Sequence, residues 1–352
     1  MSAKFHPLEV AEVAPCGADA VAVRFRVPEA LRDAYAFTPG QYLTLRATID
    51  GEEVRRSYSI ASAPGEDPMV GIKRVEGGRF STFAQGLRPG DILDVMTPEG
   101  RFVWKGERDV LLIAAGSGIT PMMAIAEAAL GAGARVSLVY GNRNTASIMF
   151  RERLEALKDR YLGNFTLIHI LSREEQDIPI LHGRIEPDRI ARLADAGAIT
   201  PETAEGIFLC GPGQMIDALA EHFGKTGVPP GRIHHERFQP EGAAAVMPPS
   251  SRARAVAAEG VAVEVILDGA RRGFTLEAGD ASVVEAAARQ GLELPYSCKG
   301  GMCCTCRCRI VEGSAEMAVN YALEPWELEA GFTLACQSRP TSDRLVLDFD
   351  AA

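Results

Sequence analysis

Residues 298–306 read C-K-G-G-M-C-C-T-C, and L-A-C-Q follows at residues 334–337. Four cysteines in these stretches have the spacing C-x4-C-x2-C…C, which is the ligand spacing of a [2Fe–2S] cluster. They are Cys298, Cys303, Cys306 and Cys336. The loop can bind two irons only if its backbone bends tightly around them, and Gly300 and Gly301 permit such bends. We therefore predict a loop that wraps a cluster, with amide N–H groups directed at the sulfur atoms.

Other interpretations of these cysteines fit the sequence less well. A structural zinc site usually has paired C-x2-C units, and only Cys303 and Cys306 show that spacing. A Rieske centre needs two histidines, and none lies near the loop. A disulfide framework is not expected, because 352 residues can bury a core and the N-terminus carries no secretory signal. Cys304 and Cys308 fall outside the pattern and are interpreted as free thiols.

Charge and composition exclude several classes of function. The net charge of −10 disfavours binding to nucleic acid. Residues 261–352 contain fourteen Asp and Glu against eight Lys and Arg, a net of −6, which would attract a basic partner or simply keep the protein soluble. The most apolar region, residues 110–130, is interrupted by glycine, proline and glutamate, so no membrane span is predicted. We expect a cytoplasmic protein, since thiolate ligands suit a reducing compartment.

The first part of the chain, residues 1–104, alternates apolar and polar positions as half-buried strands do. Pro-Gly and Asp-Gly dipeptides separate the predicted strands. Regularly spaced short strands of this kind are typical of an antiparallel barrel. The strands are expected at residues 21–27, 42–47, 54–60, 69–75 and 91–96.

Within this part, residues 56–59 read R-S-Y-S. In a strand Arg56 and Tyr58 share one face, so a guanidinium and a flat ring project together. The pair suits a ligand that has both a phosphate and a planar ring system. The following G-G-R-F-S-T supplies a phosphate site at a predicted short helix, with Ser81 or Thr82 as its N-cap.

Residues 105–239 alternate strands with helices, which is typical of a parallel sheet. The apolar run at residues 110–115 leads directly into G-S-G-I-T-P at residues 116–121. We predict Thr120 as the helix N-cap and Pro121 as the first helical residue. A glycine turn between strand and helix binds a dinucleotide pyrophosphate, although a plain tight turn looks similar.

The second strand of this part, residues 135–140, is followed by Arg143, Ser147 and Arg151. We expect a helix to begin near Ser147, which would place Ser147 and Arg151 one turn apart. No acidic residue stands at the strand end, so this set favours NADPH over NADH. A solvated helix face is the alternative.

Further strands are predicted at residues 165–171 and 206–209, and this part of the chain ends with residues 232–238. The strand at 206–209 runs into C-G-P-G-Q-M, where Cys210 would lie beside a nicotinamide or form a small buried residue. Residues 240–258 lack periodicity and are interpreted as a semi-flexible linker. The last part, residues 259–352, is expected to contain strands at 261–265 and 274–276 and an Ala-rich helix at 282–290.

Taken together, R-S-Y-S, G-S-G-I-T-P, C-G-P-G-Q-M and the cysteine loop resemble a ferredoxin–NADP reductase fused to a plant-type ferredoxin. The resemblance implies an antiparallel β-barrel flavin domain, an α/β parallel-sheet nucleotide domain and an α+β, β-grasp ferredoxin domain. Their expected ranges are residues 1–104, 105–239 and 259–352.

Three further stretches resemble the reductase subunits of phenylacetyl-CoA epoxidases. They are Y-G-N-R-N-T-A-S-I-M-F-R-E-R-L, P-Y-S-C-K-G-G-M-C and V-N-Y-A-L-E-P-W-E-L. Such subunits pass electrons from NADPH through FAD and [2Fe–2S] to a separate di-iron oxygenase subunit. The reductase of another oxygenase or desaturase, and a non-catalytic flavin and iron–sulfur redox sensor, are the alternatives. FMN in place of FAD also stays open.

The resemblance also implies roles for single residues. Tyr58 would cover the isoalloxazine, and Ser59 would hydrogen-bond near its reactive nitrogen. The flavin phosphates would be bound by Arg56, Gly78, Ser81 and Thr82. Gly116, Gly118, Thr120 and Cys210 match nucleotide and nicotinamide positions. Glu236 matches an acidic residue near the flavin, and only Cys304 and Cys308 depart from the pattern, since relatives carry small residues there.

Overall fold

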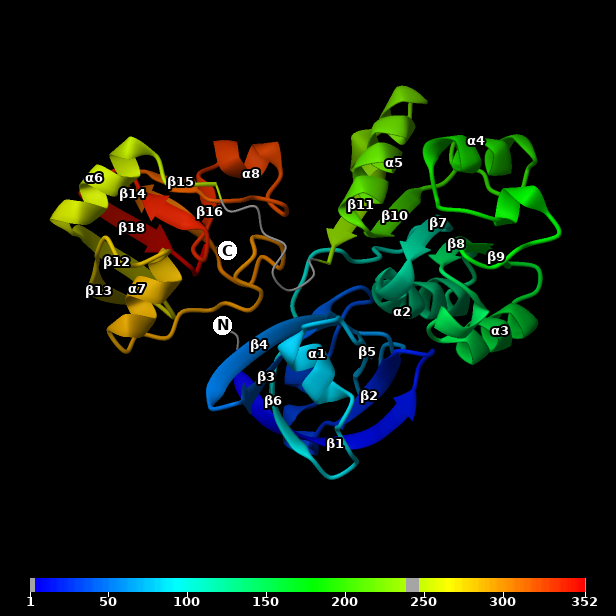
Figure 1. The fold of residues 1–352 in the computed structure, drawn as a ribbon, viewed down its shortest axis with the longest axis horizontal. Helices are drawn as coiled ribbons and strands as arrows, with labels where there is room; N and C mark the ends of the chain where they lie inside the picture. Colours follow the sequence, from blue (N-terminus) through cyan, green and yellow to red (C-terminus); the bar gives the residue numbers. More distant parts are fainter. Residues whose placement is uncertain (1–3, 239–246, 352) are drawn as a thin grey trace. The chain divides into compact units, whose positions relative to one another are not determined.

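The computed structural model describes residues 4–238 and 247–351. Two compact units are present (Figure 1): Phe5–Val54 with Tyr58–Phe238 form the first, and residues 247–351 form most of the second. Among the described residues, no helix combines the length and the apolar character needed to cross a bilayer.

An antiparallel barrel begins the first unit. Its six strands follow the order β4-β3-β6-β1-β2-β5, and a bridge between Ile60 and Val70 connects the end of β4 to β5. Alternate residues such as Leu8, Phe25 and Leu45 fill the interior, which confirms the predicted period of two. The strands are β1 (Phe5–Pro15), β2 (Ala20–Arg26), β3 (Tyr42–Ile49), β4 (Glu52–Ser59), β5 (Met69–Lys73) and β6 (Ile92–Met96); the helices are η1 (Glu29–Leu31), η2 (Asp33–Tyr35) and α1 (Arg79–Ala84).

The same unit contains a parallel sheet in the order β11-β10-β7-β8-β9. Val110 and Leu112 of β7 pack on the α2 and α3 side, while Leu111 and Ile113 pack on the α4 and α5 side. Burial on both faces explains why β7 reads as a continuous apolar run. The strands are β7 (Asp109–Ala115), β8 (Arg135–Asn142), β9 (Phe165–Leu171), β10 (Gly206–Gly211) and β11 (Ile233–Arg237); the helices are η3 (Gly116–Gly118), α2 (Ile119–Gly131), η4 (Thr145–Ser147), α3 (Arg151–Arg160), η5 (Pro179–Leu181), α4 (Pro187–Asp195), α5 (Gly213–Lys225) and η6 (Pro230–Arg232).

The predicted start of the third helix near Ser147 is wrong. Ser147 ends the 3-10 turn η4, and α3 begins only at Arg151. The turn forms because the Asn144 side chain accepts a hydrogen bond from the Ser147 N–H at 3.1 Å. Phe150 then adopts a left-handed conformation with φ 57°, which separates the turn from the helix.

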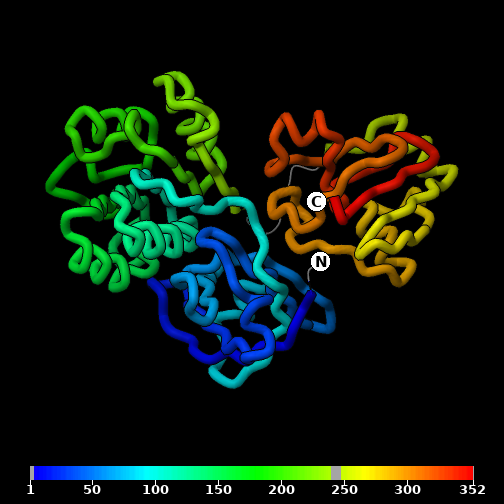
Figure 2. The backbone as a smooth tube through the Cα atoms, turned by 180° about the vertical axis from the view of Figure 1, so that it is seen from behind, coloured from blue at the N-terminus to red at the C-terminus, as the bar shows by residue number. Residues whose placement is uncertain are grey.

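A mixed sheet in the order β13-β12-β18-β14-β16 forms the core of the second unit. Its first strand, β12, pairs in parallel with its last strand, β18, and Figure 2 shows the yellow and red ends of this unit side by side. This arrangement confirms the predicted β-grasp architecture. The strands are β12 (Val261–Leu267), β13 (Ala270–Leu276), β14 (Arg307–Glu312), β15 (Ala315–Met317), β16 (Phe332–Leu334), β17 (Ser338–Pro340) and β18 (Arg344–Asp348); the helices are α6 (Ser251–Glu259), α7 (Val283–Arg289) and α8 (Pro325–Glu329).

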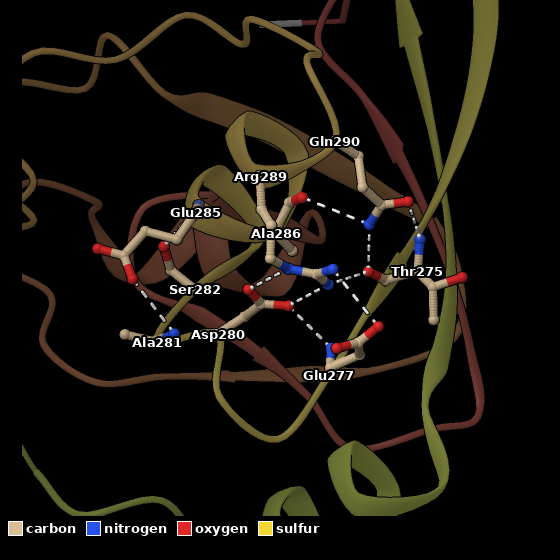
Figure 3. Close-up of polar contacts among 9 residues, drawn as sticks. All are labelled: Thr275, Glu277, Asp280, Ala281, Ser282, Glu285, Ala286, Arg289 and Gln290. Carbon is tan, nitrogen blue, oxygen red and sulfur yellow. Dashed lines mark hydrogen bonds and ion pairs between the residues drawn. The ribbon is translucent and has the colours of Figure 1, made fainter.

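Polar contacts fix α7, the predicted Ala-rich helix, beside β13 (Figure 3). Ser282 caps its N-terminus by accepting a hydrogen bond from the Glu285 N–H. At its C-terminal end Arg289 holds Asp280 through two hydrogen bonds of 3.0 and 2.8 Å, and Gln290 donates to the Thr275 carbonyl at 2.6 Å. The helix that precedes the cysteine loop is therefore anchored at both ends.

The predicted linker, residues 240–258, includes residues that form a helix. Residues 251–259 form α6, which Ser250 caps by accepting a hydrogen bond from the Ala253 N–H at 3.1 Å. Only Ala253 of this helix is buried, so its sequence lacks the apolar stripe that signals a helix. The predicted linker residues 240–246 lie outside the described residues.

A buried ion pair connects α8 to the strand that follows the cysteine loop. Glu327 of α8 is completely buried, and its Oε1 accepts a hydrogen bond from Arg307 Nε at 2.8 Å. The Arg307 guanidinium also lies 3.5 Å from the centre of the Phe332 ring on β16. The second carboxylate oxygen accepts from the Glu324 N–H at 3.0 Å, which completes a capping box.

We expect Glu327→Ala to lower the free energy of unfolding of the second unit by about 3–5 kcal/mol, because it leaves a mostly buried guanidinium without its counter-charge. Urea unfolding monitored by visible circular dichroism measures this change. Glu329→Ala, at an exposed position of the same helix, should change stability by less than about 0.5 kcal/mol. Equal effects of the two substitutions would contradict the assigned role of the ion pair.

Candidate functional site

The four predicted cluster cysteines form two pairs. Cys298 interacts with Cys303 through their side chains, and Cys306 interacts with Cys336. Within residues 4–238 and 247–351, no three His, Cys, Asp or Glu side chains converge as ligands of one ion. Two pairs of thiols instead fit a centre with two irons, each bound by two protein sulfur atoms.

The surrounding backbone is suited to negatively charged sulfur. The Gly300 N–H donates to Cys298 Sγ at 3.3 Å, and Gln337 Nε2 donates to Cys336 Sγ at 3.4 Å. The Cys303 thiol, together with backbone N–H groups, lowers the pKa of Cys298 to about 5, although burial opposes this change. The residues present therefore fit a thiolate-bound [2Fe–2S] cluster.

Tight backbone turns carry this loop, as the sequence predicted. Gly301 adopts φ 73°, and a Cβ there would lie 2.9 Å from the Val319 carbonyl oxygen. Lys299 and Cys304 adopt φ 49° and 60°, in the left-handed region that few residues favour. Cys308, in contrast, is buried on β14, where burial raises the pKa of its thiol. Its position is that of a core residue.

Strand β4 carries the residues predicted to bind the flavin. The Tyr58 ring lies against Phe80 of α1, with ring centres 5.7 Å apart. Arg56 is partly exposed on the same strand, and its Nη1 donates to the Arg55 carbonyl at 2.7 Å. A guanidinium and an aromatic ring therefore occur together on β4, as the sequence indicated.

The predicted cap of α1 is wrong, although the helix itself is confirmed. The helix begins at Arg79, with Gly78 as its N-cap residue. Ser81 lies inside the helix, and its hydroxyl accepts a hydrogen bond from the Val75 N–H at 3.1 Å. Thr82 is exposed in the same helix. Ser81 thus holds the loop that precedes the helix instead of capping it.

Ser59, Cys210 and Glu236 come together from three strands. Ser59 Oγ on β4 donates to Glu236 Oε2 on β11 at 2.9 Å. Cys210 on β10 is the direct cross-strand neighbour of Glu236, and its side chain is completely buried. The barrel and the parallel sheet meet at this polar group.

Burial controls the protonation of this group. It raises the pKa of Glu236 to about 7, while the hydrogen bond from Ser59 acts in the opposite direction. Burial, and then the negative charge of Glu236, raise the pKa of Cys210 well above its usual value. The Cys210 thiol is therefore protonated near neutral pH, whereas Glu236 gains or loses its proton there.

The glycine turn after β7 lies against β10. A Cβ on Gly118 would come within 2.2 Å of the Cys210 carbonyl oxygen, so only glycine fits. Gly116 adopts φ 56°, and its carbonyl accepts a hydrogen bond from the Tyr140 hydroxyl at 2.9 Å. These contacts fix the turn at the N-terminus of α2, where a pyrophosphate can bind.

The predicted N-cap at Thr120 is wrong, because α2 begins at Ile119 with Gly118 as its N-cap residue. Thr120 lies in the first turn, and its hydroxyl donates to the Ser117 carbonyl at 3.0 Å. Gly118 is already helical, with φ −60° and ψ −8°, so the 3-10 turn η3 continues directly into α2 and Thr120 lies beyond the start of the helix.

The three residues predicted to bind a 2′-phosphate have different environments. Ser147 is buried, and its hydroxyl donates to the Asn144 carbonyl at 2.7 Å. Arg143 is about half exposed, and its Nη2 lies 2.7 Å from Asp19 Oδ2 of the barrel. Arg151 pairs with Glu155 at 2.8 Å. The expected alignment of Ser147 and Arg151 on one helix is therefore absent. The guanidinium groups of Arg143 and Arg151 are the candidates for binding a 2′-phosphate.

Two residues beside the glycine turn at the nucleotide site were not identified from the sequence. Lys73 Nζ lies 4.0 Å from the position of a Cβ on Gly116, and it approaches Asp19 at 3.6 Å. Tyr140 positions the Gly116 carbonyl from a neighbouring strand. Both act across the sheet or between barrel and sheet, and no local motif reveals such contacts.

Comparison with known protein families agrees with these sites. Residues 7–104 match the oxidoreductase FAD-binding domain, residues 112–221 match the oxidoreductase NAD-binding domain, and residues 265–341 match the 2Fe-2S iron-sulfur cluster binding domain. FAD, a nicotinamide nucleotide and a [2Fe–2S] cluster are thus the cofactors of this chain.

Individual relatives match over nearly the full length. The chain is 44% identical to a subunit of the 1,2-phenylacetyl-CoA epoxidase of Escherichia coli (strain K12), over 99% of this chain and 98% of that one. It is 36% identical to the ferredoxin reductase component of 3-ketosteroid-9-alpha-monooxygenase from Rhodococcus rhodochrous, over 97% and 96%. The solved structure of phthalate dioxygenase reductase has the same fold, with a TM-score of 0.60, 22% identity and 98% coverage of both chains.

The rate of flavin reduction by a nicotinamide nucleotide should titrate with an apparent pKa near 7, the value to which burial raises the pKa of Glu236. Glu236→Gln should abolish this titration. Ser59→Ala should raise the apparent pKa by about one unit, because it removes a hydrogen bond that favours the carboxylate. Stopped-flow absorbance between pH 5.5 and 9 measures both effects.

The measurement must distinguish Glu236 from two neighbouring histidines. His234 and His235 directly precede Glu236, and histidine titrates in the same pH range when unperturbed. A titration that persists in Glu236→Gln would assign the ionisation to a group other than Glu236.

Proposed function

The chain belongs to the family of reductase components of multicomponent oxygenases, and from this premise we propose that it supplies electrons to a phenylacetyl-CoA epoxidase. The chain is an oxidoreductase that transfers electrons from NAD(P)H through FAD to a [2Fe–2S] cluster. The identity of the protein that accepts these electrons is the part that we propose. The observation that carries it is the 44% identity to a component of such an epoxidase over 99% of the chain.

Electron counting explains the three cofactors. A flavin takes the two electrons of a hydride and releases them singly to a cluster that accepts one. In this proposal Cys298, Cys303, Cys306 and Cys336 bind the cluster. Arg56, Gly78, Ser81 and Thr82 hold the flavin phosphates, and Tyr58 covers the ring. Gly116, Gly118 and Thr120 shape the nucleotide site.

Ser59, Cys210 and Glu236 are the proposed catalytic group. Ser59 and Glu236 share a hydrogen bond, so Ser59 is held in one orientation and the Glu236 proton lies beside it. The Cys210 thiol is completely buried and neutral, so a nicotinamide bound beside the end of β10 would meet no charge from this residue. A neutral thiol in that position disfavours water without repelling the ring.

The proposed acceptor is the di-iron oxygenase subunit of the epoxidase. The sequence of this chain has no pair of E-x-x-H motifs, so oxygen chemistry requires another subunit. We also infer a cytoplasmic location, where thiolate ligands stay reduced.

Reconstitution tests the acceptor. We expect NADPH oxidation by the purified chain to be coupled to epoxidation of phenylacetyl-CoA when the oxygenase subunits of the epoxidase are added, and product formation is measured by mass spectrometry. The chain alone should form no product. A [2Fe–2S] electron paramagnetic resonance signal on NADPH addition, without coupled epoxidation, would favour the reductase of another oxygenase. Absence of both would favour a non-catalytic redox sensor.

NADPH is the proposed nucleotide, because Arg143 and Arg151 are exposed cations that follow β8. Arg143→Ala should raise the KM for NADPH about tenfold, the cost of one charge-assisted hydrogen bond, and change the KM for NADH less than about twofold. Steady-state reduction of ferricyanide measures both constants. Arg160→Ala, at the exposed end of α3, is the matched control. An equal rise for both nucleotides would contradict recognition of a 2′-phosphate.

A further inference from the structure

One buried tyrosine connects two separate parts of the proposed nucleotide site. Tyr140 lies on β8, and its side chain is completely buried. Its hydroxyl donates to the Gly116 carbonyl at 2.9 Å and accepts a hydrogen bond from the Met149 N–H at 3.2 Å. Gly116 begins the turn that leads into α2, whereas Met149 lies just before α3. The hydroxyl therefore joins two segments that are far apart in the sequence.

The chemistry of the partners fixes the direction of both hydrogen bonds. A backbone carbonyl can only accept, and a backbone N–H can only donate. The Tyr140 hydroxyl must therefore donate to Gly116 and accept from Met149, and it needs its proton to do so. Burial raises the pKa of Tyr140 above its ordinary value, so the hydroxyl stays protonated near neutral pH. Phenylalanine has the same ring but can form neither bond.

The two segments that Tyr140 joins carry different parts of the proposed nucleotide site. The glycine turn at residues 116–118 is the proposed pyrophosphate site, at the N-terminus of α2. Arg151 is the first residue of α3 and a candidate for binding a 2′-phosphate. Only Phe150 separates this arginine from Met149. The position of the Met149 backbone therefore affects where the guanidinium lies relative to the turn.

The backbone directly after Met149 is strained. Phe150 adopts φ 57°, a left-handed conformation that is costly for an aromatic residue and persists only where the surroundings enforce it. Its ring packs against the barrel, because a Cβ on Gly71 of β5 would lie 2.9 Å from Phe150 Cζ and 2.8 Å from Thr120 Cγ2 of α2. The start of α2 and the residue that precedes α3 thus meet at one place on β5, and the Tyr140 hydroxyl connects them from the parallel sheet.

We propose that Tyr140 is a positioning residue that holds the glycine turn and the start of α3 at the spacing that one dinucleotide requires. It acts through the Gly116 carbonyl and the Met149 N–H, and it contacts neither the nucleotide nor the flavin. Because both parts of the site are held in place before the nucleotide arrives, binding does not have to order them. This inference rests on the nucleotide site of the proposed function, and it does not depend on which oxygenase accepts the electrons.

The test compares two buried tyrosines in the full chain with its cofactors. Tyr140→Phe should raise the KM for NADPH about fivefold, which corresponds to one hydrogen bond, and should leave kcat within about twofold. Tyr35→Phe is the matched control, because the Tyr35 hydroxyl is also buried and has two partners in the barrel, the Val95 carbonyl at 2.6 Å and His6 Nδ1 at 3.2 Å. This control should lower stability as well, but it should change the KM less than about twofold. Steady-state ferricyanide reduction measures KM and kcat, and urea unfolding measures stability.

A double-mutant cycle tests the coupling through Tyr140. Arg151→Ala should raise the KM for NADPH by a larger factor in the wild type than in the Tyr140→Phe background, where the arginine is already displaced. Equal factors in the two backgrounds would overturn the proposal. It would also be overturned by an unchanged KM in Tyr140→Phe, by equal rises for both tyrosine variants, or by a fall in kcat at constant KM.

A measurement on the wild type decides the question even if Tyr140→Phe does not fold. Adenosine 2′-monophosphate carries the 2′-phosphate but no pyrophosphate, so it can bind at the start of α3 without reaching the glycine turn. At a saturating concentration it should slow hydrogen–deuterium exchange at residues 116–121 as well as at residues 147–151, as read by mass spectrometry.

The outcomes of the exchange measurement separate this inference from the proposed function. Protection confined to residues 147–151 would overturn the coupling and leave the proposed function intact. No protection of either segment would overturn the assigned 2′-phosphate site and this inference with it. No oxidation of NADPH by the wild type would overturn the proposed function as well.

Discussion

The hydrogen bond between Ser59 and Glu236 is the interaction on which the proposed chemistry of the first unit depends. It joins the end of a barrel strand to the edge strand of the parallel sheet, and Glu236 is in turn the cross-strand neighbour of Cys210. Close backbone approaches support the same junction, since a Cβ on Gly118 would overlap the Cys210 carbonyl. The barrel and the parallel sheet are thus held together in one unit, at the place where we propose that a flavin and a nicotinamide meet.

The second unit meets a different requirement. To bind the proposed cluster its loop would present four sulfur atoms to two irons, and its backbone adopts left-handed conformations at Lys299, Gly301 and Cys304. Such conformations cost energy and persist only where the surroundings enforce them. Here the ion pair of Arg307 and Glu327, the bond from Gln337 to the Lys299 carbonyl and the anchored helix α7 provide that support. The fold stabilises a loop that would not be stable by itself.

Sequence patterns predicted the features that are local or strictly periodic. The alternation in the barrel, the continuous apolar run of β7, the Ala-rich helix α7 and the cysteine spacing all follow from one stretch of chain. The hydroxyls of Ser81 and Thr120 were misassigned as helix caps because each bonds to a nearby backbone group inside a helix, where the sequence looks the same as at a cap. Ser147, which was predicted to bind a 2′-phosphate, donates its hydroxyl to the Asn144 carbonyl instead. The protonation of Glu236 depends on burial and on a partner 177 residues away, and neither can be obtained from neighbouring residues.

The pair formed by Arg143 and Asp19 has a consequence for how tightly any anion can be held. A carboxylate already occupies the guanidinium at 2.7 Å, and Lys73 approaches the same carboxylate at 3.6 Å. In the proposed nucleotide site, an incoming phosphate would therefore replace an existing counter-ion, and the binding free energy gained would be the difference between two ion pairs in a half-exposed site. The internal carboxylate acts as a built-in competitor that keeps the cation oriented while it lowers the apparent strength of binding. If Arg143 binds the nucleotide as we propose, this competition would ease release of the nucleotide after each turnover.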